Sequence, residues 1–248
     1  MSASSPARFG SGRAVRRVED DALLTGRGVF ADDVPLPGQL VLHLLRSPHP
    51  HARIVSIGTA AAAAMPGVVA VLTGDDLLRA GVKPLAQSAD FRRADGSRTA
   101  APPQHALAVG VVRHVGECVA AVVAGTAHQA RDAAEAIDVR YETLPSVSEV
   151  DAALAPGAPR VWEAATGNVA CEARHGDAPK TAEAFAAAAH VVSLDLVNQR
   201  VIPASIEPRT TLASVDASGR LTIRTSCQTP TGWRDELANA LGLGKEAI

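Results

Sequence analysis

Short apolar runs separated by turn residues dominate the first part of the chain and predict strands. Residues 39–47 and 53–57 are rich in β-forming residues, and a turn with two prolines lies between them. The same pattern recurs further along, at residues 68–72, 106–112, 117–124 and 137–142. We therefore expect a strand at each of these runs.

Helical spacing of apolar residues predicts helices between these strands. The clearest helix follows Thr126, because threonine is a preferred N-cap residue. Its apolar positions recur at intervals of three and four residues: Ala127, Ala130, Ala134 and Ile137. Two shorter helices are also expected. One runs from Thr59 to Met65, and the other ends at Ala80 and is capped by Thr73 or Asp75.

Strands interleaved with short helices over residues 39–145 indicate one compact domain of the α/β or α+β class. Residues 1–17 are polar and are expected to form a mobile tail. Residues 83–104 show no periodicity and predict a surface excursion. Prolines and glycines gather at residues 150–175, which predicts the boundary to a second region.

The second region has a weaker alternation of elements. We expect helices at residues 181–189 and 232–241, one strand at 191–199, and a strand pair at 210–215 and 220–226. Gly242 follows the final helix and is expected to end it, because glycine readily adopts the left-handed conformation found there.

Charge and composition argue against several classes of protein. The chain has 24 Lys and Arg against 26 Asp and Glu, and its basic residues are scattered. This distribution argues against nucleic acid or an anionic membrane as the main partner. Apolar runs stay well short of the roughly 18 residues that a membrane span needs, and the polar N-terminus has no secretory h-region. We expect no membrane span and a cytoplasmic location.

Cysteine and histidine residues give weak signals. Cys118, Cys171 and Cys227 are widely spaced and form neither a disulfide framework nor a Cys-x-x-Cys motif. Cys118 and Cys227 could act as nucleophiles, but inert packing is the favoured interpretation. His49 and His51 could share a metal on one face of a strand. The prolines around them favour a turn, and the third ligand that zinc requires is not evident nearby.

Several longer blocks resemble one known family. Four of them lie in the first region: residues 46–54 (RSPHPHARI), 65–73 (MPGVVAVLT), 115–123 (VGECVAAVV) and 133–145 (AAEAIDVRYETLP). Three lie in the second region: residues 198–209 (NQRVIPASIEPR), 225–230 (TSCQTP) and 241–248 (LGLGKEAI). Together they resemble the molybdenum-binding subunit of the xanthine dehydrogenase, aldehyde oxidase and carbon monoxide dehydrogenase family.

This resemblance implies a fold of the α+β class, with an a/b hammerhead domain followed by the beginning of a molybdenum cofactor-binding α+β domain. The implied organisation is a flexible tail at residues 1–20, the hammerhead domain at 21–150, and an incomplete N-terminal portion of the molybdopterin-binding domain at 151–248.

The resemblance also implies one cofactor-binding residue. In the family, a glutamine in the block that matches residues 225–230 donates its side-chain amide to an oxygen ligand of molybdenum, and Gln228 holds that position here. A neutral amide can donate to such an oxygen without competing as a ligand. Arg200, Glu207 and Arg209 match a corner that supports the cofactor domain, where a structural ion pair is favoured over cofactor contact. No catalytic residue and no protein ligand to the metal is expected in this chain.

The implied activity is oxidative hydroxylation of an aldehyde, an N-heterocycle or a related small molecule, with water as the oxygen source. Molybdenum–molybdopterin is the implied cofactor. The implied partners are the remainder of the subunit and separate iron–sulfur and FAD subunits. The family's glycine-rich loop and glutamate base have no counterpart in this sequence, so the chain is expected to be inactive alone. A non-catalytic docking subunit or a truncated gene product is the alternative.

Overall fold

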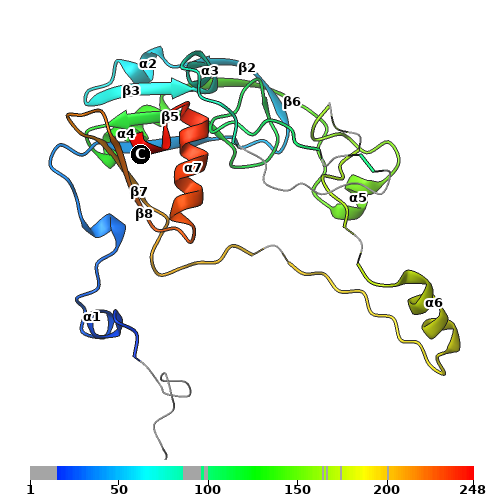
Figure 1. Ribbon diagram of the computed structural model, residues 1–248. Coiled ribbons are helices and arrows are strands. Elements are labelled where there is room, and N and C mark those ends of the chain that lie inside the picture. Colours follow the sequence, from blue (N-terminus) through cyan, green and yellow to red (C-terminus); the bar gives the residue numbers. More distant parts are fainter. Residues whose placement is uncertain are drawn as a thin grey trace, which may run out of the picture.

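The computed structural model describes residues 16–85, 96–97, 100–163, 165, 167–173, 175–199 and 201–248. Most of the predicted tail, the greater part of the predicted excursion at 83–104, and Arg200 lie outside these residues. The described chain forms two packed three-stranded sheets, with a hairpin and a long helix beside them and an arm that projects away (Figure 1).

The first two sheets make up the larger body. One has the order β1 (Val41–Arg46), β5 (Cys118–Ala124), β3 (Val68–Thr73). The other has the order β4 (Val111–Val112), β2 (Ala52–Gly58), β6 (Asp138–Thr143). The consecutive strands β1 and β2 therefore lie in different sheets, and the proline turn between them carries the chain from one sheet to the other.

Three helices connect these strands. Helix α4 (Ala127–Glu135) packs on β1 and β5, while α2 (Ala60–Ala63) packs on β3 and α4. Helix α3 (Gly74–Arg79) follows β3 directly. The left-handed backbone of the loop before β3 favours glycine at position 67. Its φ is +80°, and a Cβ there would lie 2.3 Å from the Gln129 side chain.

Strand β5 contributes buried residues to both groups of core residues. Its side chains Ala120, Val122 and Ala124 pack with the buried alanines of α4, while Val119 packs with Ala52, Ala108 and Val112. Ile57 and Val139, from the second sheet, pack against both groups. A strand buried on both faces reads as a continuous apolar run, which is why residues 117–124 show no alternation.

Most predicted elements of this body are confirmed, with three corrections. The strand predicted over 106–112 is reduced to β4, because only Val111 and Val112 pair with β2. Ala127 is exposed, and Ala133 takes its expected place on the buried face of α4. Two short helices were not predicted: α1 (Asp20–Leu24) and η2 (Ala31–Asp33).

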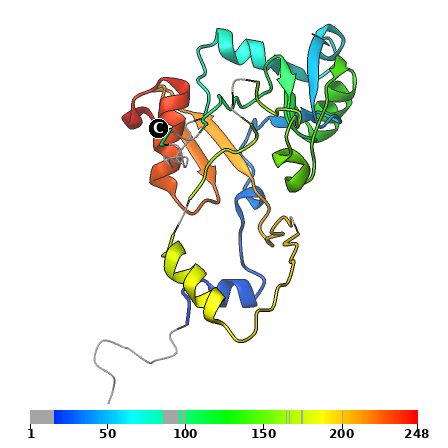
Figure 2. The same cartoon turned by 90° about the vertical axis from the view of Figure 1, so that its right-hand side faces the viewer.

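The second region has fewer buried residues. Helices α5 (Val150–Leu154) and α6 (Ala178–Ala187) precede the hairpin of β7 (Thr211–Val215) and β8 (Leu221–Thr225). Helix α7 (Pro230–Leu241) and η3 (Lys245–Ala247) follow, beside the hairpin (Figure 2). Gly242 caps α7 with a φ of 68°, which confirms its predicted role. The Lys83 amide donates to the Ala240 carbonyl at 2.8 Å and ties α7 to the first body.

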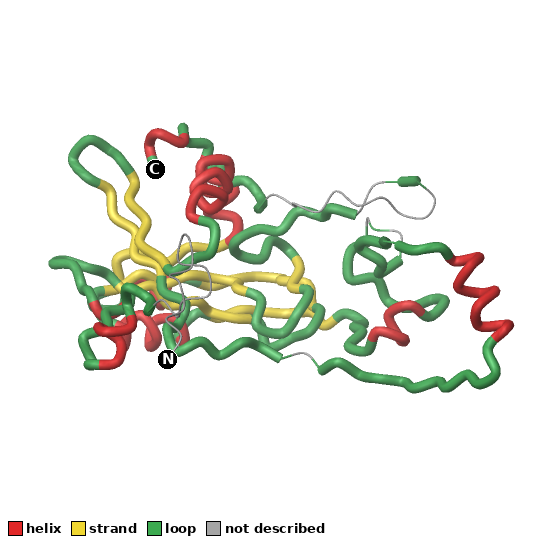
Figure 3. Tube along the Cα trace, turned by 60° about the horizontal axis from the view of Figure 1, so that its bottom comes forward, coloured by secondary structure: helices red, strands yellow, loops and turns green. Residues whose placement is uncertain are grey.

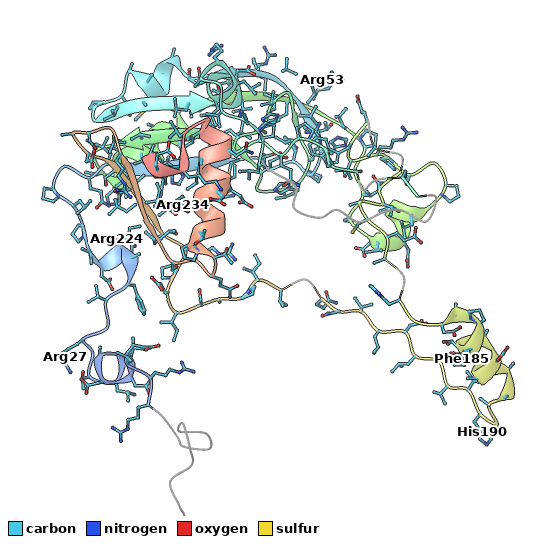
Figure 4. All side chains as sticks on the ribbon, in the orientation of Figure 1. Arg27, Arg53, Phe185, His190, Arg224 and Arg234 are labelled. Atoms are coloured by element: carbon cyan, nitrogen blue, oxygen red, sulfur yellow. The ribbon has the colours of Figure 1, made fainter. Side chains whose placement is uncertain are left out.

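The strand predicted at 191–199 is wrong. The segment is extended, but it pairs with no strand among the described residues and projects with α6 as an arm (Figure 3). Its apolar side chains therefore remain in solvent, as do Phe185 and His190 at the outer end of the arm (Figure 4). The sequence pattern is that of a strand, but a strand also requires a hydrogen-bonding neighbour.

The fold class is α+β. Every strand pair in the described chain is antiparallel, and the crossover helices of a parallel α/β sheet are missing from that part. The structure thus decides between the two classes that the alternation of strands and helices left open.

Candidate functional site

Gln228 lies in the loop that joins β8 to α7. This loop begins at a fixed point, because Thr225 at the end of β8 pairs with Thr211. The Thr225 hydroxyl also donates to the Thr210 carbonyl at 2.9 Å. Gln228 follows three residues later and its side chain is exposed. Its amide is therefore available to a ligand from outside the described chain.

The N-terminus of α7 adjoins Gln228. Thr229 is the N-cap residue and Pro230 opens the helix, where its fixed φ and missing N–H are well suited. The Trp233 amide donates to the Thr229 carbonyl at 3.0 Å, which closes the first turn. The first amides of a helix lack intrahelical acceptors and carry a partial positive charge. The loop thus places a neutral amide donor beside the positive end of a helix.

A groove of about 450 Å³ runs between β8 and α7, next to this loop. Its walls include Ile223, Trp233 and Leu237, with the half-buried Cys227 near Gln228 and Arg234 on α7. In Figure 4, Arg224 on β8 and Arg234 on α7 mark the two elements that flank the groove. The groove offers apolar surface together with the Arg234 side chain.

The hairpin turn that sets the register of β8 is held by one carboxylate. Asp216 accepts hydrogen bonds from the Ser218 hydroxyl at 2.6 Å, the Ser218 amide at 2.8 Å and the Arg220 amide at 3.1 Å. These donors, the Ser218 hydroxyl first, hold the pKa of Asp216 below its ordinary value. The turn therefore fixes the start of β8, and the strand carries that register to the Gln228 loop.

The predicted supporting residues have different surroundings. The Glu207 carboxylate accepts a hydrogen bond from the Ala31 amide at 3.2 Å, so the approach to β7 is tied to the N-terminal segment. Arg209 is exposed, and within residues 201–248 it forms no ion pair with Glu207. Arg200 lies outside the described residues. The family role of these three side chains therefore stays a prediction.

The histidines and cysteines that the sequence singled out are not brought together. The His49 ring contacts Tyr141 edge-on at 4.8 Å between centroids, whereas His51 Nδ1 lies 2.7 Å from the Pro145 carbonyl. Among the described residues, no three His, Cys, Asp or Glu side chains are grouped so as to hold a metal ion. Nor does that part of the chain contain a helix long and apolar enough to cross a membrane.

Sequence reasoning missed a second cavity of about 450 Å³, which lies between the first body and residues 161–162. Arg113, His114, Glu117 and Trp162 line it. Arg113 and Trp162 are far apart in sequence and belong to no shared motif, so a pattern search along the chain has nothing to detect.

Gln228, its adjoining helix end and the groove fit one edge of a site for a group rich in oxygen acceptors. A side-chain amide can donate to such oxygens, and the first-turn amides of a helix favour negative charge.

Both regions of the chain match models of known domain families. Residues 25–145 match the a/b hammerhead domain of aldehyde oxidase and xanthine dehydrogenase, and residues 161–248 match the molybdopterin cofactor-binding domain. The chain therefore belongs to the family of molybdenum-binding subunits of xanthine dehydrogenase, aldehyde oxidase and carbon monoxide dehydrogenase, and it corresponds to their N-terminal part.

Individual relatives agree with this assignment. The carbon monoxide dehydrogenase large chain of Afipia carboxidovorans is 36% identical, over 96% of this chain and 30% of its own length. The nicotine 6-hydroxylase large subunit of Paenarthrobacter nicotinovorans is 38% identical, over 88% of this chain and 26% of its own length. The crystal structure of quinoline 2-oxidoreductase from Pseudomonas putida 86 superposes with a TM-score of 0.82 and 37% identity, over 94% of this chain and 29% of that one. The chain thus spans less than a third of each relative.

Proposed function

We propose that this chain forms the front part of the molybdenum-binding subunit of a molybdenum hydroxylase and contributes one edge of its cofactor site. The main support is the order of the two matched domains, the hammerhead domain at 25–145 and the cofactor-binding domain at 161–248. The proposed reaction is the oxidative hydroxylation of an aldehyde, N-heterocycle or related small molecule, with the oxygen drawn from water.

Gln228 is the proposed cofactor contact. Its exposed side chain can donate a hydrogen bond to an oxygen of the cofactor, while the pinned end of β8 restricts where the loop can place it. When bound, the molybdenum cofactor supplies the two-electron redox chemistry. The chain's own contribution is to bind and orient it. Glu207 and Arg209 are proposed to support the approach to β7.

Further polypeptide is proposed to complete the site. The segment after α6 exposes large apolar side chains at fractions of 56–91%: Val191, Val192, Leu194, Leu196, Val197, Val201, Ile202 and Ile206. Large apolar side chains exposed in such number along one segment are typical of an interaction site. The proposed cover is the polypeptide that corresponds to the rest of the relatives' length. Iron–sulfur and FAD subunits are the proposed electron acceptors, and the cytoplasm is the proposed location.

Metal analysis tests this proposal. The purified chain alone is expected to hold no stoichiometric molybdenum and to show no dehydrogenase activity, because Gln228 is the one cofactor contact assigned to it. Supplying the remaining part of the subunit, in trans or by fusion, is expected to give a complex that retains molybdenum and turns over a substrate.

Two outcomes oppose the proposal. Stoichiometric molybdenum in the isolated chain would show that its own residues suffice for binding. A complex that assembles with the remaining polypeptide but never acquires molybdenum would favour a non-catalytic docking role. Sequencing the DNA that follows this coding segment identifies the polypeptide to be supplied.

A further inference from the structure

Arg113 connects the two regions of the chain. It follows β4, within the hammerhead match, and its guanidinium reaches the first residues of the cofactor-domain match. Nε donates to the Val161 carbonyl at 3.2 Å, and Cζ lies 3.6 Å from the centroid of the Trp162 ring. A guanidinium stacked on indole is among the stronger cation–π arrangements.

The Arg113 end of this contact is held in place within the first body. Nη1 donates to the Val111 carbonyl at 3.1 Å, and the Arg113 amide donates to the Glu117 carboxylate. Burial lowers the pKa of Arg113, while the charges of Glu117 and Glu163 act in the opposite direction. Because the ordinary pKa of arginine lies far above neutral pH, the guanidinium keeps its charge.

The Trp162 end is held by the Asn168 side chain and by the Ala165 amide, which donates to the Trp162 carbonyl at 3.0 Å. Asn168 accepts from the Val161 amide at 3.0 Å and donates to the carbonyls of Ala153 at 3.0 Å and Pro159 at 2.9 Å. The segment 153–168 is therefore closed on itself, and Arg113 attaches the closed segment to the first body. The prolines and glycines of this segment predicted only a boundary between domains, and not these contacts.

We propose that the Arg113–Trp162 contact is a latch that fixes the opening of the second region on the hammerhead domain, with Arg113 as its positioning residue. Segments between domains allow relative motion unless specific contacts oppose it. Here the contact combines a directed hydrogen bond and ring stacking, which the planar guanidinium can supply together and an ammonium cannot. The inference rests on contacts within this chain and is independent of the proposed function.

Hydrogen exchange of the Val161 amide reports opening of the latched segment in the full chain, because this amide donates to Asn168 while Arg113 holds the Val161 carbonyl. Arg113→Ala is expected to raise the exchange rate of this amide about fivefold or more, since the segment opens more often once it is detached. Arg113→Lys is expected to recover little of the protection. Arg53→Ala is the matched control, because Arg53 lies in the same body and pairs only at the surface with Glu142, at 3.2 Å. It should leave the Val161 amide unchanged.

A spectroscopic signal and a double mutant complete the test. The chain has two tryptophans, so Trp233→Phe leaves Trp162 as the reporter. Its emission is expected to shift to longer wavelength and to become more accessible to acrylamide in Arg113→Ala. For exchange at Val161, Trp162→Leu is expected to act like Arg113→Ala, and the two changes together should add little to either alone.

Wild-type exchange at Val161 in Arg113→Ala would overturn the latch, as would simply additive effects of the two substitutions. Should Arg113→Ala fail to fold, Arg113→Lys and Trp162→Leu carry the same test, and wild-type exchange in both would equally reject the proposal.

Discussion

Gln228 is the residue on which the proposed cofactor contact depends. In an enzyme assembled with the rest of the subunit, Gln228→Ala should leave folding nearly intact, because the side chain is exposed in the described chain. Turnover should fall because the activation free energy rises. The loss of one preorganised donor costs about 2.7–4 kcal/mol, and we expect the lower end of that range here. Gln228→Glu should be worse, because a carboxylate facing an anionic oxygen is repelled unless it takes up a proton.

The measurement for Gln228 is turnover at matched molybdenum content. Gln104→Ala, at an exposed glutamine of the first body, is the control and should keep wild-type turnover. Wild-type turnover with full molybdenum occupancy in both Gln228 variants would make Gln228 an ordinary loop residue.

Asp76 links the stability of the first body to pH. Its carboxylate accepts from the Thr73 hydroxyl at 2.6 Å and the Thr73 amide at 2.8 Å, and these bonds, the hydroxyl first, lower its pKa. A carboxyl group whose pKa is lowered by folding stabilises the folded state at pH values above its unfolded-state pKa of about 3.9. This contribution to stability is lost as the pH falls through the lower, folded-state pKa. Asp76→Asn should therefore lower the melting temperature at pH 7 and lose most of this effect near pH 2.

The pH dependence is checked by thermal melts of both proteins across this range. Asp75→Asn, in the same first turn, is the control, because Asp76 and not Asp75 closes the capping box with Thr73. A gap between wild type and Asp76→Asn that stays constant with pH would contradict the assignment.

At the scale of elements, the N-cap of helix α4 is the contact whose removal has the clearest expected effect on the free energy of unfolding. The Thr126 hydroxyl accepts a hydrogen bond from the backbone amide of Gln129 at 3.2 Å. Thr126→Ala should lower the free energy of unfolding by ~1 kcal/mol, the usual effect of losing an N-cap. Urea unfolding followed by circular dichroism measures it, because both tryptophans lie outside this body.

Thr59 provides the matched comparison for Thr126. It occupies the N-cap position of α2, but within the described chain its side chain makes no capping hydrogen bond. Thr59→Ala should therefore shift the midpoint much less. Equal shifts in the two variants would show that threonine's intrinsic preference, and not the hydrogen bond, sets the cost.

At the scale of the whole molecule, we expect residues 20–148 to fold as one unit and residues 150–248 to be far less stable alone. The first body buries β5 between two groups of core residues, whereas Ala238 and Ala240 are the buried residues found in the described part of the second region. An unpaired hairpin edge and a thin core favour local opening.

Limited trypsin digestion with mass spectrometry distinguishes the two regions. Early cleavage is expected at exposed basic residues of the second region, such as Lys180, Arg209 and Arg224, while a fragment covering most of 20–148 persists. Survival of the second region after loss of the first would reject this prediction.

The sequence by itself determined the elements whose signals are local. The caps at Thr73 and Thr126 and the apolar spacing of α4 act within one or two turns of a helix, so the pattern located them. The seven blocks that resemble the family also indicated membership of it, because they follow one another along the chain in the family's order. The function of Gln228 remains a prediction drawn from that order.

Tertiary structure decided what depends on distant neighbours. Residues 191–199 have the composition of a strand, yet no described strand pairs with them, since pairing needs a second chain segment that local sequence cannot supply. The separation of β1 and β2 into different sheets, and the contact of Arg113 with Trp162, likewise arise from packing between remote segments. Sequence periodicity reports which face of an element is apolar, whereas only the folded chain selects the surface that the face meets.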